Sequence, residues 1–393
     1  MKTVNKTSEK SRYPGSSARP HRICLSLSLS RLKMKHKSLI TSLIGTAAVT
    51  WSSTVCAQSA ITPYGMIDMA VVRESGGSAG SVTKLTSGVS AGSRLGFKGT
   101  EDLGNGLSAL FVLESGFQGD TGALGQGGLL FGRQAYVGLR GGFGSVLVGR
   151  QYTPEYLVVV FADPFGSGYA ADSKNIVATS GNSLSRMDNT VKYLSPTVAG
   201  VNVELAAAPG EVPGDSAAGR QFGGSIAYAA GPLQVRVGYH NRNNDTATLK
   251  NTENGRNVVL AAVYDFGRVK LHALYGANHG LNSSVLRNTS NPFSRATTPV
   301  ASTNSRDTLI GLTVPFGPHA LLASYIHKDD RTKLNQDANQ AAIGYRYTLS
   351  KRTNVYAVHA WIDNRNGASY TVGNASEAGT GNHGTSVGVS HTF

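Results

Sequence analysis

The sequence predicts an all-β fold, a 16-stranded antiparallel transmembrane β-barrel. Three observations support this prediction: a leader typical of exported proteins, a regular alternation of short turns with long polar loops, and a final segment in which apolar and small polar residues alternate up to Phe393. The main competing fold is a soluble β-sandwich, in which loops of different lengths would be mixed at both ends of the sheets.

The first 57 residues predict a leader rather than part of the fold. Met34-Lys-His-Lys37 is basic, residues 38–50 are mostly apolar, and Val55-Cys-Ala57 places a small residue before Gln58. This layout is typical of a secretory signal peptide, and the apolar run is too short to cross a bilayer. An amphipathic anchor helix and a lipoprotein attached through Cys56 are the alternatives. We expect a signal peptide at 34–57, preceded at 1–33 by an over-extended, disordered N-terminus.

Removing the leader changes the charge of the chain. The whole sequence carries 37 Lys and Arg against 23 acids, but residues 1–57 contain ten of the basic residues and a single acid, Glu9. The remaining 27 basic and 22 acidic residues give a net charge of +5. The high pI is therefore weak evidence for nucleic-acid binding, and we expect none. Both cysteines also lie in the leader, which excludes a disulfide framework and a thiolate metal site in the mature chain.

Residues 58–393 predict one large β-domain, because alternating segments of about ten residues recur along it without a linker. The short interruptions, rich in residues that suit hairpin turns, lie at 102–106, 141–142, 198–200, 230–232, 266–268, 316–318 and 349–352. The long polar connections lie at 73–88, 119–129, 151–187, 209–220, 244–256, 278–305, 328–337 and 363–382. Together they separate sixteen strands, with short turns at one end and long loops at the other, as is typical of an outer-membrane barrel.

The strands alternate as a barrel with one lipid face and one wet face requires. In the last segment the apolar or aromatic face consists of Val387, Val389, His391 and Phe393, and small polar residues occupy the other face. In the segment 258–266, every second residue from Val258 is apolar. The candidates for interfacial aromatic girdles are Trp361 and the tyrosines at 64, 136, 193, 228, 239, 264, 275, 325, 345 and 356.

Several stretches carry a recognisable pattern: Tyr64-Gly65, Ser93-Arg-Leu-Gly-Phe-Lys-Gly-Thr-Glu-Asp-Leu-Gly104, the hairpin 131–151, Tyr193-Leu-Ser-Pro196 and His391-Thr-Phe393. With them, essentially all of 58–393 resembles the trimeric general porins of Gram-negative outer membranes. The resemblance implies a sixteen-stranded barrel in outer-membrane lipid, a homotrimer, and a third extracellular loop folded into the lumen as a constriction loop. It also implies that Phe393, with His391 as a variant position, forms a signal read by the outer-membrane assembly machinery.

The loop that the resemblance places in the lumen is 151–187. Its sequence is unusual, because Tyr156-Leu-Val-Val-Val-Phe161 is an apolar run inside a loop. Such a run needs a surface to pack on, and the inner wall of a barrel would provide one. An extra edge strand is the alternative.

The resemblance further implies a narrow waist lined by opposed charges. Arg94 and Arg133 match basic positions of the family's constriction, and Arg186 matches a third. Alternation alone would place Arg133 on the face of Ala135 and Val137, so its inward assignment comes from the resemblance. The alternative for each arginine is a solvated charge on the wall or a loop.

On the loop side, Asp163 is the first acidic candidate, followed by Glu155 and Asp172. Met66 stands where some porins carry a lysine, which leaves the strength of any selectivity open. With three arginines against few acids, we expect a weak to moderate preference for anions.

The expected function is a water-filled channel for passive diffusion of small hydrophilic solutes and ions. The alternative is a substrate-specific porin for a sugar or an organic anion. Two G-x-S-x-G matches, at 76–80 and 384–388, lie in a loop and a strand rather than at a strand-to-helix turn. The histidines lack zinc-site spacing, and no phosphate-binding loop is present. We therefore expect no enzyme activity, cofactor or metal.

Overall fold

The computed structural model describes residues 60–179, 185–286, 288–296 and 298–393. The expected signal peptide at 34–57 and the N-terminal stretch 1–33 lie outside the described residues. The strands are β1 (Ala60–Gly77), β2 (Gly80–Ser87), β3 (Arg94–Gly104), β4 (Leu107–Gly116), β5 (Gln134–Gly141), β6 (Gly144–Tyr152), β7 (Arg186–Leu194), β8 (Val201–Ala208), β9 (Gln221–Ala230), β10 (Leu233–Arg242), β11 (Gly255–Asp265), β12 (Lys270–His279), β13 (Asn304–Phe316), β14 (His319–Asp330), β15 (Ala338–Thr348), β16 (Thr353–Asn364) and β17 (His383–Thr392).

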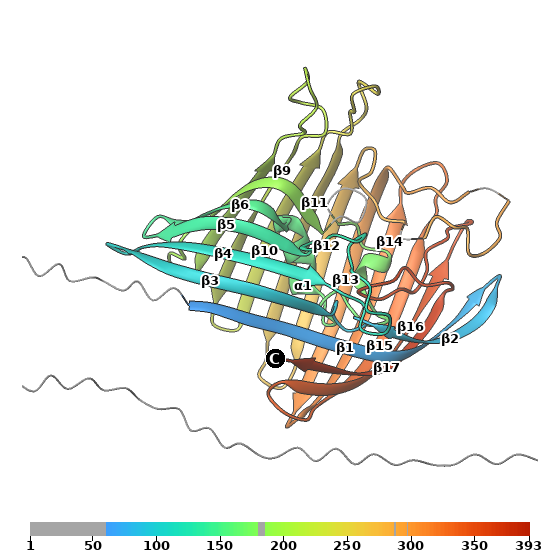
Figure 1. The fold of residues 1–393 in the computed structure, drawn as a ribbon. Coiled ribbons are helices and arrows are strands. Elements are labelled where there is room, and N and C mark those ends of the chain that lie inside the picture. The colour runs from blue at the N-terminus through green and yellow to red at the C-terminus, as the bar shows by residue number, and fades with distance from the viewer. Residues whose placement is uncertain (1–59, 180–184, 287, 297) are drawn as a thin grey trace, which may run out of the picture. The chain divides into compact units, whose positions relative to one another are not determined.

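These strands form a closed antiparallel barrel (Figure 1), which confirms the predicted fold class. From β3 onward each strand pairs with the next along the chain, and β17 returns to pair with β1 from Met66↔Thr392 to Ser75↔His383. Gly65 and Phe393 exchange two backbone hydrogen bonds of 3.1 Å at the seam. Both β2 and β3 pair with β1, β2 along its second half and β3 along its first. The seventeen segments therefore occupy sixteen positions in the wall.

The first predicted long loop is wrong in its extent. Residues 73–88 form a hairpin instead, because β1 continues to Gly77 and β2 begins at Gly80. The irregular segment lies later, at 88–93, between β2 and β3, which together serve as one strand of the wall. The other predicted turns and loops separate strands close to the expected bounds, and the loop 209–220 falls between β8 and β9 without any shift.

Side chains alternate across the wall as the sequence predicts. In β11, Val258, Leu260 and Tyr264 are exposed on the outside, whereas Val259 and Ala261 are buried on the inside. In β17, Val387 and Val389 are exposed, and Ser386 and Ser390 are buried. The outer apolar surface is the face that an outer-membrane barrel presents to lipid.

Not every predicted girdle tyrosine lies on the outside. Tyr64 donates a 3.0 Å hydrogen bond to Glu114, and Tyr356 donates one of 3.0 Å to Asp68, so both point into the barrel. Tyr136 also faces inward, because its neighbour Val137 is exposed on the outer face. Residue type alone could not separate these tyrosines from those at the lipid interface.

The loop between β6 and β7 folds into the lumen and carries a helix, α1 (Pro154–Ala162), and a short 3-10 helix, η1 (Ser173–Asn175) (Figure 1). The sequence did not predict α1. Thr153 caps it by accepting a 3.2 Å hydrogen bond from the Tyr156 N–H, and Pro154 occupies its first turn. The helix packs on the inner faces of β9 to β12, as expected for the apolar run. Among the described residues, no helix is long and apolar enough to span a membrane.

Glycines on the inner wall make room for this loop. A Cβ atom on Gly238 in β10 would lie 3.0 Å from the Glu155 Cα atom. One on Gly311 in β13 would lie 2.6 Å from the Pro164 ring, and one on Gly344 in β15 would lie 2.7 Å from the Phe165 ring. The distances at Gly311 and Gly344 are too short for a real Cβ atom, and the distance at Gly238 is tighter than most, so the loop rests directly on the wall backbone at these strands.

The loop 365–382 also enters the barrel, which the sequence did not indicate. Residues 368–374 are buried, and the Gly373 N–H donates a 3.0 Å hydrogen bond to Asn175 Oδ1 in η1. In the break between β2 and β3, the Val89 carbonyl accepts from the Tyr169 N–H at 2.6 Å and from the Ala375 N–H at 3.5 Å. The interrupted strand therefore joins both inserted loops to the wall.

Gly311→Ala should destabilise the barrel, because the added methyl group would meet Pro164. Overpacking of this kind costs about 1–3 kcal/mol. Gly276→Ala in the adjacent strand is the matched control, since its Cβ would lie at an ordinary 3.4 Å from Asp307. Urea titration of the barrel in detergent measures both free energies of unfolding. Equal effects of the two substitutions would contradict the close contact.

Candidate functional site

A cavity of about 320 Å³ lies between the inserted loop and the barrel wall. The three predicted arginines, Arg94, Arg133 and Arg186, all line it. They belong to separate parts of the wall: Arg94 begins β3, Arg133 precedes β5, and Arg186 begins β7. The structure therefore brings together three cations that lie far apart in the sequence.

Arg133 lies in the bend before β5 rather than in the strand, so the alternation that would turn it outward does not apply to it. Its guanidinium lies close to Gly92, where a Cβ atom would be 2.8 Å from Arg133 Nη1. The side chain is buried, at 8% exposure. The bend thus aims Arg133 into the lumen while Val137, four residues later, faces outward.

Glu114 in β4 is the counter-charge of this wall, and the sequence reasoning missed it. It accepts a 2.8 Å hydrogen bond from Arg133 Nε and lies 3.8 Å from Arg94 Nε. Tyr64 also donates to it. One buried carboxylate therefore neutralises part of the charge of two arginines and fixes their position.

Tyr152, at the end of β6, connects two of the arginines. Its hydroxyl accepts hydrogen bonds from Arg133 Nη2 at 2.8 Å and from Arg186 Nη2 at 2.7 Å. The Arg186 guanidinium also lies over the Tyr152 ring, 4.3 Å from its centre. The Tyr152 hydroxyl thus holds two like charges near each other by hydrogen bonds, without neutralising either charge.

The inserted loop supplies a fourth cation that the sequence reasoning missed. Lys174 in η1 lines the same cavity, 5.6 Å from the centre of the Tyr156 ring. Tyr156 in α1 stacks on Tyr152 with ring centres 5.6 Å apart. Lys174 also forms an ion pair with Asp172, at 3.5 Å. Its position beside the arginines could not be read from the sequence, because it depends on how the loop folds back.

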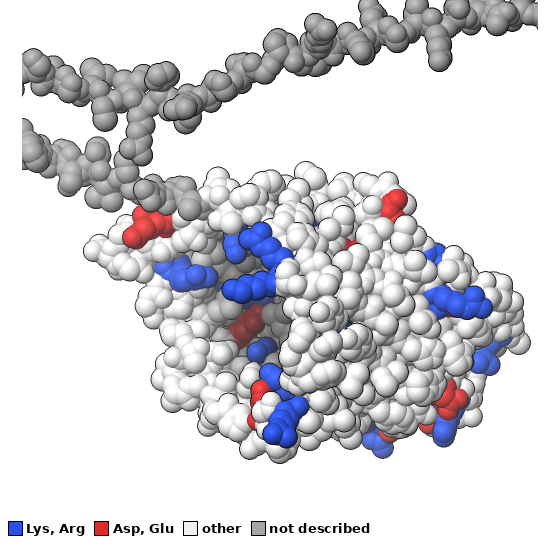
Figure 2. Space-filling model, turned by 90° about the horizontal axis from the view of Figure 1, so that it is seen from below, with Lys and Arg blue, Asp and Glu red and all other residues white. Residues whose placement is uncertain are grey.

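The resulting surface is basic. Figure 2 shows a hollow in the molecule with Lys and Arg side chains gathered around it and acidic side chains within. Guanidinium groups with unused N–H donors, in a narrow water-filled passage, attract anions and pair with them transiently. Within the described ranges, no group of three or more His, Cys, Asp or Glu residues could hold a metal ion.

Comparison with known proteins identifies the family. The sequence model of the Gram-negative porin family matches residues 45–367. The chain belongs to the Gram-negative porins. This porin is 31% identical over 369 residues to outer membrane porin protein 32 of Delftia acidovorans, covering 90% of this chain and 99% of that protein. It is 29% identical over 340 residues to major outer membrane protein P.IB of Neisseria meningitidis serogroup B, covering 83% and 94%. The porin is thus an outer-membrane protein whose barrel crosses the membrane many times.

Solved structures agree with this assignment. An anion-selective porin from Comamonas acidovorans superimposes with a TM-score of 0.70 at 26% identity, covering 86% of this chain and all of that one. A Salmonella typhi OmpF structure, determined in complex with daunomycin, shares the fold at a TM-score of 0.64 and 18% identity, covering 85% of this chain and 97% of that one.

The three predicted loop acids of the porin lie inside the loop. Glu155, Asp163 and Asp172 are 1%, 4% and 0% exposed. Asp163 accepts backbone N–H bonds from Phe165 at 2.9 Å and from Ser173 at 3.1 Å, and burial raises its pKa to about 6. These contacts give the carboxylate a role in holding the loop. A contribution of the three acids to the field in the lumen stays a prediction.

Glu114→Gln should destabilise the porin strongly, because it leaves Arg133 buried beside an uncharged amide. Removing one partner of a buried ion pair costs about 3–5 kcal/mol. Glu101→Gln, on the exposed end of β3, is the control and should change the free energy of unfolding by less than about 0.5 kcal/mol. Urea titration in detergent compares them. A cost at Glu114 no larger than that at Glu101 would show that the carboxylate does not organise the arginines.

Proposed function

We propose that this porin is a water-filled channel for passive diffusion of small hydrophilic solutes and ions, with a weak to moderate preference for anions. The observation that carries the proposal is the convergence of Arg94, Arg133, Arg186 and Lys174 on one cavity. No chemical step is part of this function.

The balance of charge at the cavity supports the sign of the preference. Glu114 is shared by Arg94 and Arg133, and Asp172 lies beneath Lys174. Arg186 has no ion pair among the described residues; it donates to the Tyr152 hydroxyl and lines the same cavity as the other three cations. The excess positive charge lowers the energy of an anion in the waist and raises that of a cation.

Two further points bear on the sign and the strength of the preference. A relative of known structure at 26% identity is described as anion-selective, which agrees with the proposed sign. Met66, near the seam of the barrel, adds no charge where a lysine would add one. We therefore propose that the preference for anions is weak to moderate.

A substrate-specific porin for an organic anion or a sugar is the second candidate. The stacked rings of Tyr152 and Tyr156 beside Arg186 favour it, because aromatic faces and guanidinium groups together can hold a planar or ring-shaped solute. Saturation of the conductance by one solute, with no saturation by chloride, would favour this candidate over general diffusion.

Arg133→Ala should shift the reversal potential in a salt gradient across a planar bilayer toward zero. A unit charge about 4 Å from an ion is worth about 1–4 kcal/mol, so the anion-to-cation permeability ratio should fall severalfold. Arg352→Ala, in the exposed turn between β15 and β16, is the control for loss of one charge and should retain the preference. A cation preference in the unaltered porin, or an unchanged ratio in Arg133→Ala, would refute the proposal.

We also propose that the porin is a homotrimer and that Phe393, with His391, forms the signal read by the outer-membrane assembly machinery. Phe393 is half exposed, and its ring lies against Gly65, so it is available on the outside of the seam. Deleting Phe393 should reduce the yield of trimer in the outer membrane more than the conductance of those channels that form. Closure of single channels in three steps measures the trimer. A normal yield from the deletion variant would contradict the signal.

A further inference from the structure

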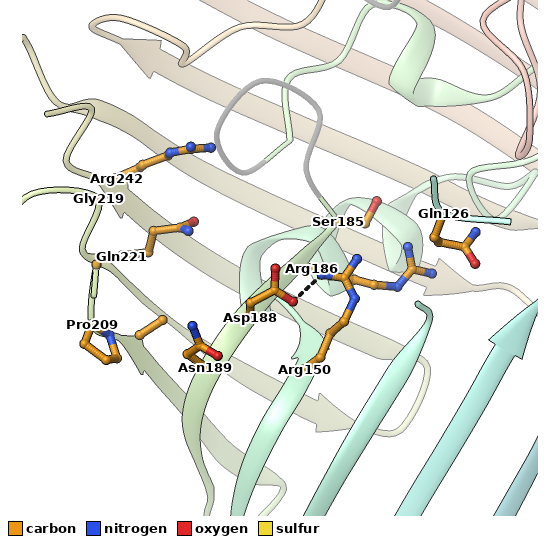
Figure 3. Close-up of a pocket in the computed structure, with 12 residues that line it drawn as sticks. Gln126, Arg150, Ser185, Arg186, Asp188, Asn189, Pro209, Gly219, Gln221 and Arg242 are labelled. Atoms are coloured by element: carbon orange, nitrogen blue, oxygen red, sulfur yellow. Dashed lines mark hydrogen bonds and ion pairs between the residues drawn. The ribbon is translucent and has the colours of Figure 1, made fainter. Parts of the chain in front are cut away.

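A second basic cavity, of about 420 Å³, lies next to the constriction on the side of the long loops. Its charged lining consists of Arg150, Arg186, Arg242 and Asp188, drawn in Figure 3. These residues stand at the ends of β6 and β10 and at the start of β7, where the chain leaves or enters the wall. Arg186 lines both cavities, so the two are neighbours that share one guanidinium group.

The backbone aims these arginines into the cavity. Gly149 has a φ of +132°, and the pairing of β6 with β7 shifts register between Gly149 and Gln151. A Cβ atom at Gly149 would lie 2.1 Å from the Ala135 carbonyl oxygen, so this bulge requires glycine. The bulge turns Arg150, which would otherwise share the outer face of Val146 and Val148.

Arg242 reaches the cavity through regular alternation in β10. Arg236 and Gly238, on the same face of that strand, lie against Phe161 and α1 in the lumen. Gln221, which pairs with Arg242 across β9 and β10, lines the cavity beside it. Figure 3 shows Arg242 and Gln221 on one side of the cavity and Arg150 and Arg186 on the other.

The cavity carries more positive charge than it can neutralise. Arg150 forms an ion pair with Asp188 and donates a 2.7 Å hydrogen bond from Nε to the Gly132 carbonyl. Within the part of the chain that the structure describes, Arg186 and Arg242 form no ion pair. The buried Nε atoms of both also have no hydrogen-bond partner there. Two guanidinium groups therefore keep a positive charge that no described acidic side chain neutralises.

We propose that this cavity is a second anion site, selective for small oxyanions that carry two negative charges. The net charge of the lining matches a dianion better than a halide. The planar donor fork of arginine pairs with two oxygens of a phosphate or carboxylate, whereas chloride offers a single centre. The amide of Gln221 supplies a further polar contact for such an anion.

The site would collect dianions before the constriction and pass them along Arg186. Because Arg186 belongs to both cavities, an anion can exchange partners there without returning to free solution. The inference rests on the proposed passage of anions through the constriction. It adds a preference for oxyanions with two charges over chloride. The three constriction arginines alone would favour anions in general.

Inorganic phosphate, at a pH where it carries two negative charges, is the probe. It should reduce the chloride current through single channels of the complete porin in a saturable manner. Arg242→Gln should raise the half-saturating phosphate concentration about tenfold or more, since charge-assisted hydrogen bonds are lost. Arg268→Gln, in the turn between β11 and β12, is the matched control and should leave that concentration unchanged.

Arg242→Lys provides a second test that keeps the charge but removes the fork. We expect an effect between those of the unaltered porin and Arg242→Gln. Absence of phosphate block in the unaltered porin, or an equal block in Arg242→Gln, would overturn the site. A failure of the general anion preference would appear separately, as a reversal potential of the wrong sign in the unaltered porin, whatever phosphate does.

Discussion

The structure depends on holding like charges together in one narrow passage. Free guanidinium groups at this separation repel one another and would turn away into water. Here Glu114 holds Arg94 and Arg133 from the wall side, and the Tyr152 hydroxyl accepts from Arg133 and Arg186. The compensation is partial, because one carboxylate and one neutral hydroxyl serve three cations. That partial compensation keeps each side chain in a defined position and leaves part of the positive charge unpaired.

A second requirement follows from placing a loop inside a barrel. Buried backbone groups need hydrogen-bond partners, and an irregular loop cannot supply them all from within. The wall provides several: the Asp307 carboxylate accepts from the Ala178 N–H at 2.8 Å and from Lys328 at 2.6 Å, and Gln340 donates to the Ala171 carbonyl at 3.0 Å. The inner glycines of β10, β13 and β15 then allow the loop to approach the wall closely.

The barrel could be predicted from the sequence, because alternation and turn residues are local properties. The convergence of Arg94, Arg133 and Arg186 came from the family resemblance, since alternation would have turned Arg133 outward. Glu114 and Lys174 were missed, because their importance depends on contacts between distant segments. The helix α1 was missed because nine mostly apolar residues give no helical periodicity, and its cap and proline are recognisable once the helix is known. The inserted loop 365–382 has a polar composition that does not distinguish it from an extracellular loop.

The pairing of β1 with β17 has a consequence for the time course of biosynthesis. Ribosomes make β1 before the other strands of the wall. Its partner β17, which ends beside Phe393, is made last, so β1 cannot complete its pairing until then. Until then the hydrogen-bonding edge of β1 stays open, and open edges invite pairing with the wrong chain. The period in which this edge can mispair therefore lasts as long as the translation and transit of the chain.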